Sequence, residues 1–217
     1  MRALPAMFAI ACAVLSGCMT KRTPPPGTSV SVAPVEEGLP TAWRQVATAA
    51  DIMRIDALGA AWTHGLAVAR PGELAREAAL LDPKSALTKP APSPGAYRCR
   101  MIKLGASGRR ALQAFKPFFC FVGAEGALLT FAKASGTQRP AGRLWDDGDK
   151  RLVFLGAMAL SPDAPPPAYG ADVRRNRVGV VERIGDFRWR MTLLPQGGDA
   201  ALDVIELVPN TPPPSAS

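Results

Sequence analysis

The chain has 217 residues, of which 26 are lysine or arginine and 18 are aspartate or glutamate, so its formal net charge is +8. This length supports the core of one domain and excludes an assembly of several domains. A basic protein is attracted to anionic partners, and the compartment decides which of them it meets.

The first seventeen residues have the pattern of a secretory signal. Arg2 precedes an apolar run, Ala6 to Leu15, which is too short to span a bilayer and is followed by small residues. Leu15-Ser16-Gly17-Cys18 resembles the lipobox of bacterial lipoproteins, in which the cysteine takes a diacylglycerol and becomes residue one after cleavage. We therefore expect residues 1–17 to be a lipoprotein signal peptide and Cys18 to be acylated. The alternative is an ordinary cleaved signal with an incidental cysteine.

Residues 18–40 should form a disordered tether, because they are rich in proline, serine, glycine and threonine and poor in large apolar side chains. Residues 210–217 should form an equally loose tail. In lipoproteins an aspartate after the cysteine commonly retains the protein in the inner membrane. Met19 stands there instead, which favours the outer membrane and a periplasm-facing domain. A basic protein tethered there would meet lipid headgroups and polyanionic glycans, whereas nucleic acid is a poor partner in that compartment.

Residues 41–209 should form a single globular domain that begins with two helices within 41–82. Thr48 and Asp51 have the spacing of a capping box, and apolar side chains then recur every three or four residues. This pattern predicts an amphipathic helix, and Pro71 then starts a second, shorter helix.

From residue 97 onward, short runs of aromatic and β-branched residues are separated by glycine, aspartate and proline, so 97–209 should be a β-domain. Eight strands with short links favour an antiparallel meander, and we prefer a small closed barrel to a sandwich because closure removes exposed edges. The expected fold class is therefore α+β. The expected strands are Tyr97 to Leu104, Phe118 to Val122, Leu128 to Lys133, Gly142 to Asp146, Arg151 to Leu160, Val178 to Arg183, Phe187 to Leu193 and Leu202 to Val208.

One hairpin register can be predicted from charge. A two-residue turn at Gly148-Asp149 places glycine first, as a type II′ turn requires, and pairs Asp147 with Lys150. Trp145 then lies opposite Leu152. The aspartates around this turn could instead hold a calcium ion, but turn formation explains them with fewer assumptions.

The cysteines predict one disulfide. Cys12 leaves with the signal and Cys18 is the lipid site, so Cys99 and Cys120 remain, and an oxidising periplasm favours their pairing. A metal site is the rival interpretation, but two thiols and His64, the single histidine, fall short of a zinc shell unless carboxylates assist. We expect no metal and no cofactor. His64 has no recognisable nucleophile motif to work with, so we assign no catalytic residue and expect a histidine on a helix surface.

Two of the expected strands carry arginines at alternate positions. Arg98 and Arg100 alternate with apolar residues in the first, and Arg188 and Arg190 do so in the other. This period sends the arginines to one face of the sheet. They form either a solvated face or a binding patch whose guanidinium groups contact phosphate or carboxylate. In the second case, glutamate at Arg188 and Arg190 would abolish binding without unfolding the domain.

The blocks "YRCRMIKLG", "SGTQRPAGRLWDDGDKRLVFLGA", "VGVVERIGDFRWRM" and "LDVIELVP" resemble the bacterial family catalogued as domain of unknown function 4893. Its members are predicted exported lipoproteins. The resemblance runs from about Trp43 to Val208 and implies a single secreted domain, but it implies no activity.

Two classes of function remain. The first is a non-catalytic role in the cell envelope, in which the lipid anchor holds the protein on a membrane and the β-domain binds an anionic component or a protein partner. The alternative is an envelope hydrolase with an unrecognised pair of carboxylates. The absence of a recognisable catalytic motif and the basic balance favour the binding role.

Overall fold

The computed structural model describes residues 42–105, 111–196 and 202–210. The signal peptide, Cys18, the tether and residues 211–217 lie outside these ranges, and what the sequence predicts for them stays a prediction. No helix within the described ranges is both long enough and apolar enough to cross a membrane.

The described chain begins with short helices. They are α1 (Trp43–Val46), α2 (Ala49–Asp56), α3 (Leu58–Val68) and α4 (Pro71–Glu77), and a 3₁₀ turn, η1 (Ala78–Leu80), extends α4. The predicted cap at Thr48 is confirmed, because its Oγ1 accepts a hydrogen bond from the Asp51 N–H at 3.2 Å. Pro71 occupies the first turn of α4, where its missing N–H costs no helical hydrogen bond.

The strands follow in antiparallel order. They are β1 (Gly95–Leu104), β2 (Leu112–Ala114), β3 (Phe118–Glu125), β4 (Leu128–Lys133), β5 (Arg139–Asp146), β6 (Arg151–Ala159), β7 (Asn176–Gly185), β8 (Arg188–Leu194) and β9 (Leu202–Pro209). A second 3₁₀ turn, η2 (Val173–Arg175), precedes β7. Strands occur in all eight predicted regions, and the three-residue β2 is additional.

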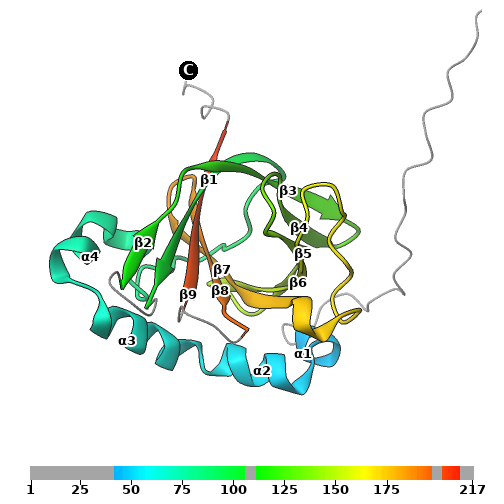
Figure 1. The fold of residues 1–217 in the computed structure, drawn as a ribbon, viewed down its shortest axis with the longest axis horizontal. Coiled ribbons are helices and arrows are strands. Elements are labelled where there is room, and N and C mark those ends of the chain that lie inside the picture. The colour runs from blue at the N-terminus through cyan, green and yellow to red at the C-terminus, as the bar shows by residue number, and fades with distance from the viewer. Residues whose placement is uncertain (1–41, 106–110, 197–201, 211–217) are drawn as a thin grey trace, which may run out of the picture. The chain divides into compact units, whose positions relative to one another are not determined.

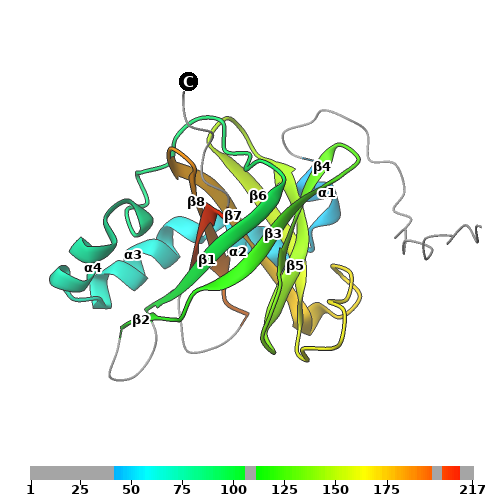
Figure 2. The same cartoon turned by 90° about the horizontal axis from the view of Figure 1, so that it is seen from above.

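Eight strands close into a barrel in the order β1-β3-β4-β5-β6-β7-β8-β9, and β9 pairs back onto β1. The prediction of a closed antiparallel barrel is therefore confirmed. β2 pairs with the second half of β1, beyond β3, and Figure 2 shows it extending past the barrel. The domain is mostly β, with the short helices in a row along one side of the barrel (Figure 1), so the α+β class holds only in this coarse sense.

The expectation of two helices is wrong, because the described residues contain four α-helices. The long helix predicted after Thr48 is broken at Ala57 into α2 and α3. The break has a packing reason: α2 contacts β7 whereas α3 contacts β9, so the chain bends to follow the curved wall of the barrel. With four residues, α1 is too short to show a helical period in the sequence.

Apolar side chains gather in two clusters on opposite sides of the barrel wall. The interior cluster contains Phe131 and Phe154, whose rings pack edge to face. The outer cluster lies between the wall and the helices and contains Trp43 and Trp62. Because β6 contributes to both clusters, it is buried at nearly every position rather than at alternate ones.

The predicted register of the β5–β6 hairpin is wrong by one residue. Trp145 lies opposite Val153, and both belong to the cluster beneath the helices. The reason is Asp147, whose carboxylate accepts hydrogen bonds from Trp43 Nε1 at 3.0 Å and from Arg151 Nε at 2.6 Å. Because Asp147 is hydrogen-bonded to Trp43 of α1 and to Arg151, it does not pair with Lys150. The loop that connects β5 and β6 is therefore longer than two residues.

Candidate functional site

Arg190, one of the four arginines singled out by alternation, is completely buried between the barrel wall and the helices. Its Nε and Nη2 donate to Glu182 Oε2 at 2.9 and 2.6 Å. Its Nη1 donates to the carbonyl oxygens of Leu80 and Asp82 at 3.2 and 2.6 Å, and the guanidinium lies 5.0 Å from the centroid of the Trp62 ring. Arg190 thus donates hydrogen bonds to carbonyl oxygens at and just after the end of η1, and it attaches the helical segment to β8.

Arg100 and Arg188 are also neutralised by carboxylates. Arg100 donates to both oxygens of Glu77 on α4, at 3.0 and 2.7 Å, and to Glu206 on β9. Arg188 donates to the other oxygen of Glu206 at 2.6 Å. The hydrogen bonds to Glu77, followed by those to Glu206, raise the pKa of Arg100 against the opposing effect of burial. Arg100 therefore connects α4 to the barrel wall, and Glu206 of β9 joins Arg100 to Arg188.

Arg98 differs from the other three because it is exposed. It lies on the outer surface of β1 between Phe119 of β3 and Val208 of β9, and it has no ion-pair partner among the described residues. The alternation thus identifies one surface arginine, two that hold the helical segment to the barrel, and Arg188, which pairs with a neighbouring strand.

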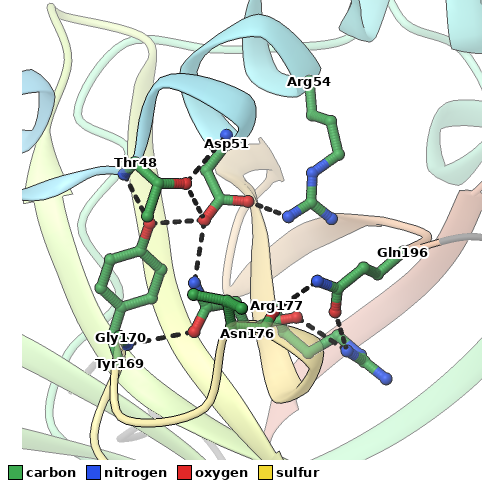
Figure 3. A network of polar contacts seen from close by, with 9 residues as sticks. Thr48, Asp51, Arg54, Tyr169, Gly170, Asn176, Arg177 and Gln196 are labelled. Atoms are coloured by element: carbon green, nitrogen blue, oxygen red, sulfur yellow. Dashed lines mark hydrogen bonds and ion pairs between the residues drawn. The ribbon is translucent and has the colours of Figure 1, made fainter.

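A buried polar network lies where α2 meets β7 (Figure 3). Asp51 is 1% exposed, and its Oδ2 accepts hydrogen bonds from the Thr48 hydroxyl at 2.8 Å, the Tyr169 hydroxyl at 2.5 Å and Asn176 Nδ2 at 3.1 Å. Arg54 forms an ion pair with Oδ1. Each oxygen of the carboxylate is therefore occupied, and the network holds α2 and the segment before β7 onto the barrel.

One end of the barrel carries charged side chains at inward-facing positions. Because neighbouring strands run in opposite directions, β1 and β4 end where β7 and β9 begin. Within each strand, the charged residue continues the alternate positions whose side chains pack in the interior. We call this group the barrel mouth, and it consists of Lys103, Lys133, Arg177 and Asp203.

The contacts of the barrel mouth leave positive charge in excess. Lys103 Nζ pairs with Asp203 at 2.9 Å. Lys133 Nζ donates to the carbonyl of Gln138 at 3.0 Å and lies 4.6 Å from the Phe118 ring centroid. Arg177 Nη1 donates to the Asn176 carbonyl and to Gln196 Oε1, at 2.7 and 3.0 Å. Three cations thus meet one carboxylate, which leaves a formal charge of +2.

The electrostatics agree with this contact pattern. Burial lowers the pKa of Lys133 and of Arg177, and in each case attraction to Asp203 opposes the effect. Burial also lowers the pKa of Arg54, and repulsion from Arg177 adds to that change while Tyr169 opposes it. Half-buried cations whose nearby carboxylate, Asp203, is already paired with Lys103 would be stabilised by an additional anion.

The sequence analysis missed the barrel mouth. A signal was available, because Lys103 and Lys133 continue the inward alternation of Tyr97, Cys99 and Phe131 but replace the expected apolar side chain with a cation. A charge at an inward position near a strand end indicates a barrel opening rather than the packed core. The group can hold an anion.

The disulfide between Cys99 and Cys120 is confirmed. It joins β1 to β3 inside the barrel, with both cysteines fully buried and their Cα atoms 6.1 Å apart. Both therefore belong to the interior packing cluster.

The carboxylates of the helix–barrel interface are held as ion pairs. Glu182, Glu206 and Asp51 all accept hydrogen bonds from arginines. His64 is exposed on α3. Within the described ranges no group of three or more histidine, cysteine, aspartate or glutamate residues is arranged to hold a metal ion.

Comparison with known proteins agrees with the sequence blocks. No curated protein and no solved structure matches the chain. The model of one family, described as "Domain of unknown function (DUF4893)", matches residues 43–207, which includes the helices and nearly the whole barrel. The chain therefore belongs to the DUF4893 family.

Proposed function

We propose that this protein is held in the cell envelope by a lipid on Cys18, faces the periplasm from the outer membrane, and binds an anionic envelope component without catalysis. The observation that carries the binding role is the barrel mouth, where Lys133 and Arg177 are partly buried without a carboxylate of their own among the described residues. A phosphate or carboxylate group would supply the missing charge.

The distribution of ion pairs supports this assignment. Arg100, Arg188 and Arg190 have carboxylate partners from the helices or neighbouring strands, so their charge is already neutralised. The barrel mouth retains its excess, and it lies at the rim of the barrel, where ligands of β-barrels commonly bind. An incoming anion would therefore be attracted to the mouth more strongly than to the helix-covered wall.

The hydrolase alternative has less support. A general acid requires a carboxyl group whose pKa is raised toward neutrality. Asp56 and Glu125 have pKa values lowered by hydrogen bonds from Arg44 and Arg143, and Glu182 and Glu206 are bound by arginines. With their pKa values lowered, Asp56 and Glu125 stay ionised at neutral pH and do not deliver protons.

The lipid anchor gives the first prediction. We expect intact mass spectrometry of the mature protein to show a chain that begins at an acylated Cys18, because the lipobox directs cleavage before that residue. Several acyl chains contribute about 0.8 kcal/mol per buried CH₂ group, which is enough for stable anchoring. The control is a lipid-free mature protein, residues 18–217 with Cys18→Ala, exported behind a signal that is cleaved without a cysteine. Recovery of the wild-type protein with an unmodified Cys18 would disprove the anchor.

The barrel mouth gives the second prediction. The lipid-free mature protein should co-sediment with purified envelope fractions at about 0.1 M salt and be released at about 1 M, since the screening length falls from about 10 Å to about 3 Å. Lys133→Gln combined with Arg177→Gln should weaken binding about tenfold or more, because each replacement removes a charge-assisted contact.

A matched control separates this site from general surface charge. Arg98→Gln combined with Lys84→Gln removes the same charge from exposed positions and should leave binding within about twofold. Equal losses in the two double variants would assign binding to the overall charge and contradict the barrel mouth. The pH dependence of binding gives a second readout. The pKa of Lys133 lies below the ordinary lysine value of 10.5, so Lys133 loses its charge, and binding should decrease, before the pH reaches that value. Lys133→Arg should reduce this decrease, because arginine stays charged over this range.

A further inference from the structure

A second pocket lies between the helices and the barrel wall, away from the inward-facing mouth. It has a volume of about 320 Å³ and is bordered by α2 and α3 on one side and by β6 and β7 on the other. Its apolar lining is Ile55, Leu58 and Trp62, and its charged lining is Asp56, Arg151 and Glu182.

Two of these charged side chains, Arg151 and Glu182, are held in place by one hydrogen-bond partner each but retain atoms that make no hydrogen bond in the described part of the chain. The Nε of Arg151 is held by Asp147 at 2.6 Å, while its two terminal nitrogens have no hydrogen-bond partner in the described part of the chain. Glu182 uses Oε2 to accept both hydrogen bonds from Arg190, while its Oε1 has no partner there. Glu182 is also 9% exposed, so little of its side chain faces solvent. Each group therefore presents unused hydrogen-bonding capacity in a fixed orientation.

Arg151 and Glu182 do not satisfy one another. They are directly opposite in the pairing of β6 with β7, and residues so placed project to the same face of the sheet. They nevertheless form no ion pair in the described residues, because each is drawn toward another partner, Asp147 or Arg190. A ligand carrying both an acceptor for Arg151 and a donor for Glu182 can bridge them.

The formal charge of this pocket is balanced, unlike that of the barrel mouth. Asp56 is paired with Arg44 at 2.7 Å, Glu182 with Arg190 at 2.6 Å and Asp147 with Arg151 at 2.6 Å. Such a site has no net attraction for an anion or a cation, and it favours a ligand that is neutral overall but carries both charges.

We propose that this pocket binds a free amino acid with an apolar side chain. The ligand carboxylate lies against the terminal nitrogens of Arg151, its ammonium donates to Glu182, and its side chain packs on Leu58 and Trp62. The planar fork of arginine suits a carboxylate, and the buried ring of Trp62 supplies the apolar contact.

The test uses the lipid-free mature protein labelled with ¹⁵N and titrated with L-leucine. Leucine should shift the backbone amide signal of Gly59 and the indole signal of Trp62, which both line the pocket. L-leucinamide lacks the carboxylate and N-acetyl-L-leucine lacks the ammonium, so each should bind about tenfold more weakly than leucine or worse. Equal affinity for all three compounds would overturn the proposal, as would the absence of any shift with leucine up to about 10 mM.

Gly59→Leu tests the location without altering a charged group. A Cβ at Gly59 meets nothing within 4 Å, and glycine is a poor helix former, so the variant should fold while its side chain occupies the pocket. Gly72→Leu is the matched control, because Gly72 is also helical, has the same open surroundings and lies on α4. Leucine binding should be lost in the first variant and kept in the second, and binding retained by Gly59→Leu would place the ligand elsewhere. Neither result bears on anion binding at the barrel mouth.

Discussion

Replacing Arg190 with alanine is expected to lower the free energy of unfolding by about 3–5 kcal/mol, the largest loss predicted for any truncation to alanine in this protein. The side chain is completely buried, and its removal leaves the Glu182 carboxylate without its cation and the Leu80 and Asp82 carbonyls without their donor. Uncompensated polar groups in a buried site cost far more than the ion pair itself contributes. Urea unfolding followed by tryptophan fluorescence measures the change.

Arg98→Ala is the matched control. Arg98 has the same alternate position in its strand but is exposed, and the substitution should change stability by no more than about 0.5 kcal/mol. Arg190→Lys should be intermediate, since it keeps the charge but not the planar fork that reaches Glu182 and the carbonyls together. Similar unfolding curves for Arg190→Ala and Arg98→Ala would contradict the role assigned to Arg190.

Burial also reverses one expectation drawn from alternation alone. On a solvated face, glutamate at position 190 would leave the domain folded. In the structure it would face the Glu182 carboxylate in a buried site, where two like charges are strongly unfavourable. Arg190→Glu is therefore expected to prevent folding rather than to act as a binding variant.

Breaking the disulfide should also have a large effect on stability. Cys99 and Cys120 are 21 residues apart. A cross-link over a loop of that length lowers the conformational entropy of the unfolded chain and so stabilises the folded protein by roughly 3 kcal/mol. The free energy of unfolding of the lipid-free protein should fall by about this amount when a reductant is added. The double variant Cys99→Ala and Cys120→Ala should start at a similarly low value.

The reductant itself supplies the control for that experiment. It should lower the urea midpoint of the protein that contains both cysteines and leave the double alanine variant unchanged. Free thiols titrating in the unreduced, denatured protein would show that the bond is absent from the isolated molecule. Equal midpoints with and without reductant would show that the bond contributes nothing to stability.

Local patterns determined much of the barrel. Short runs of aromatic and β-branched residues located strands in eight regions, and closure follows because an antiparallel meander of that number has no exposed edges once its first and last strands pair. Counting the cysteines that would remain after the predicted signal removal identified the Cys99–Cys120 bond. These properties depend on neighbours in the chain or on residue type, and both can be read from a sequence.

Features that depend on distant partners could not be predicted in this way. The break at Ala57 follows from the curvature of the wall against which α2 and α3 pack. The register of the β5–β6 hairpin depends on the Trp43 indole, which is 104 residues from the Asp147 carboxylate it contacts. The charge rule used only residues inside the hairpin, so it could not account for a hydrogen bond from outside it.

Arg190 and Lys133 show which properties of the candidate sites follow from local sequence patterns and which depend on distant partners. The sequence by itself determined that the alternating arginines share a face of the sheet, but not that α4 and η1 cover part of that face and neutralise Arg100 and Arg190. Conversely, Lys133 lies near the end of an ordinary strand in the sequence, and only barrel closure brings it into the electrostatic field of Asp203, 70 residues later. Alternation specifies the direction of a side chain, whereas the tertiary structure decides which charges and which solvent it meets there.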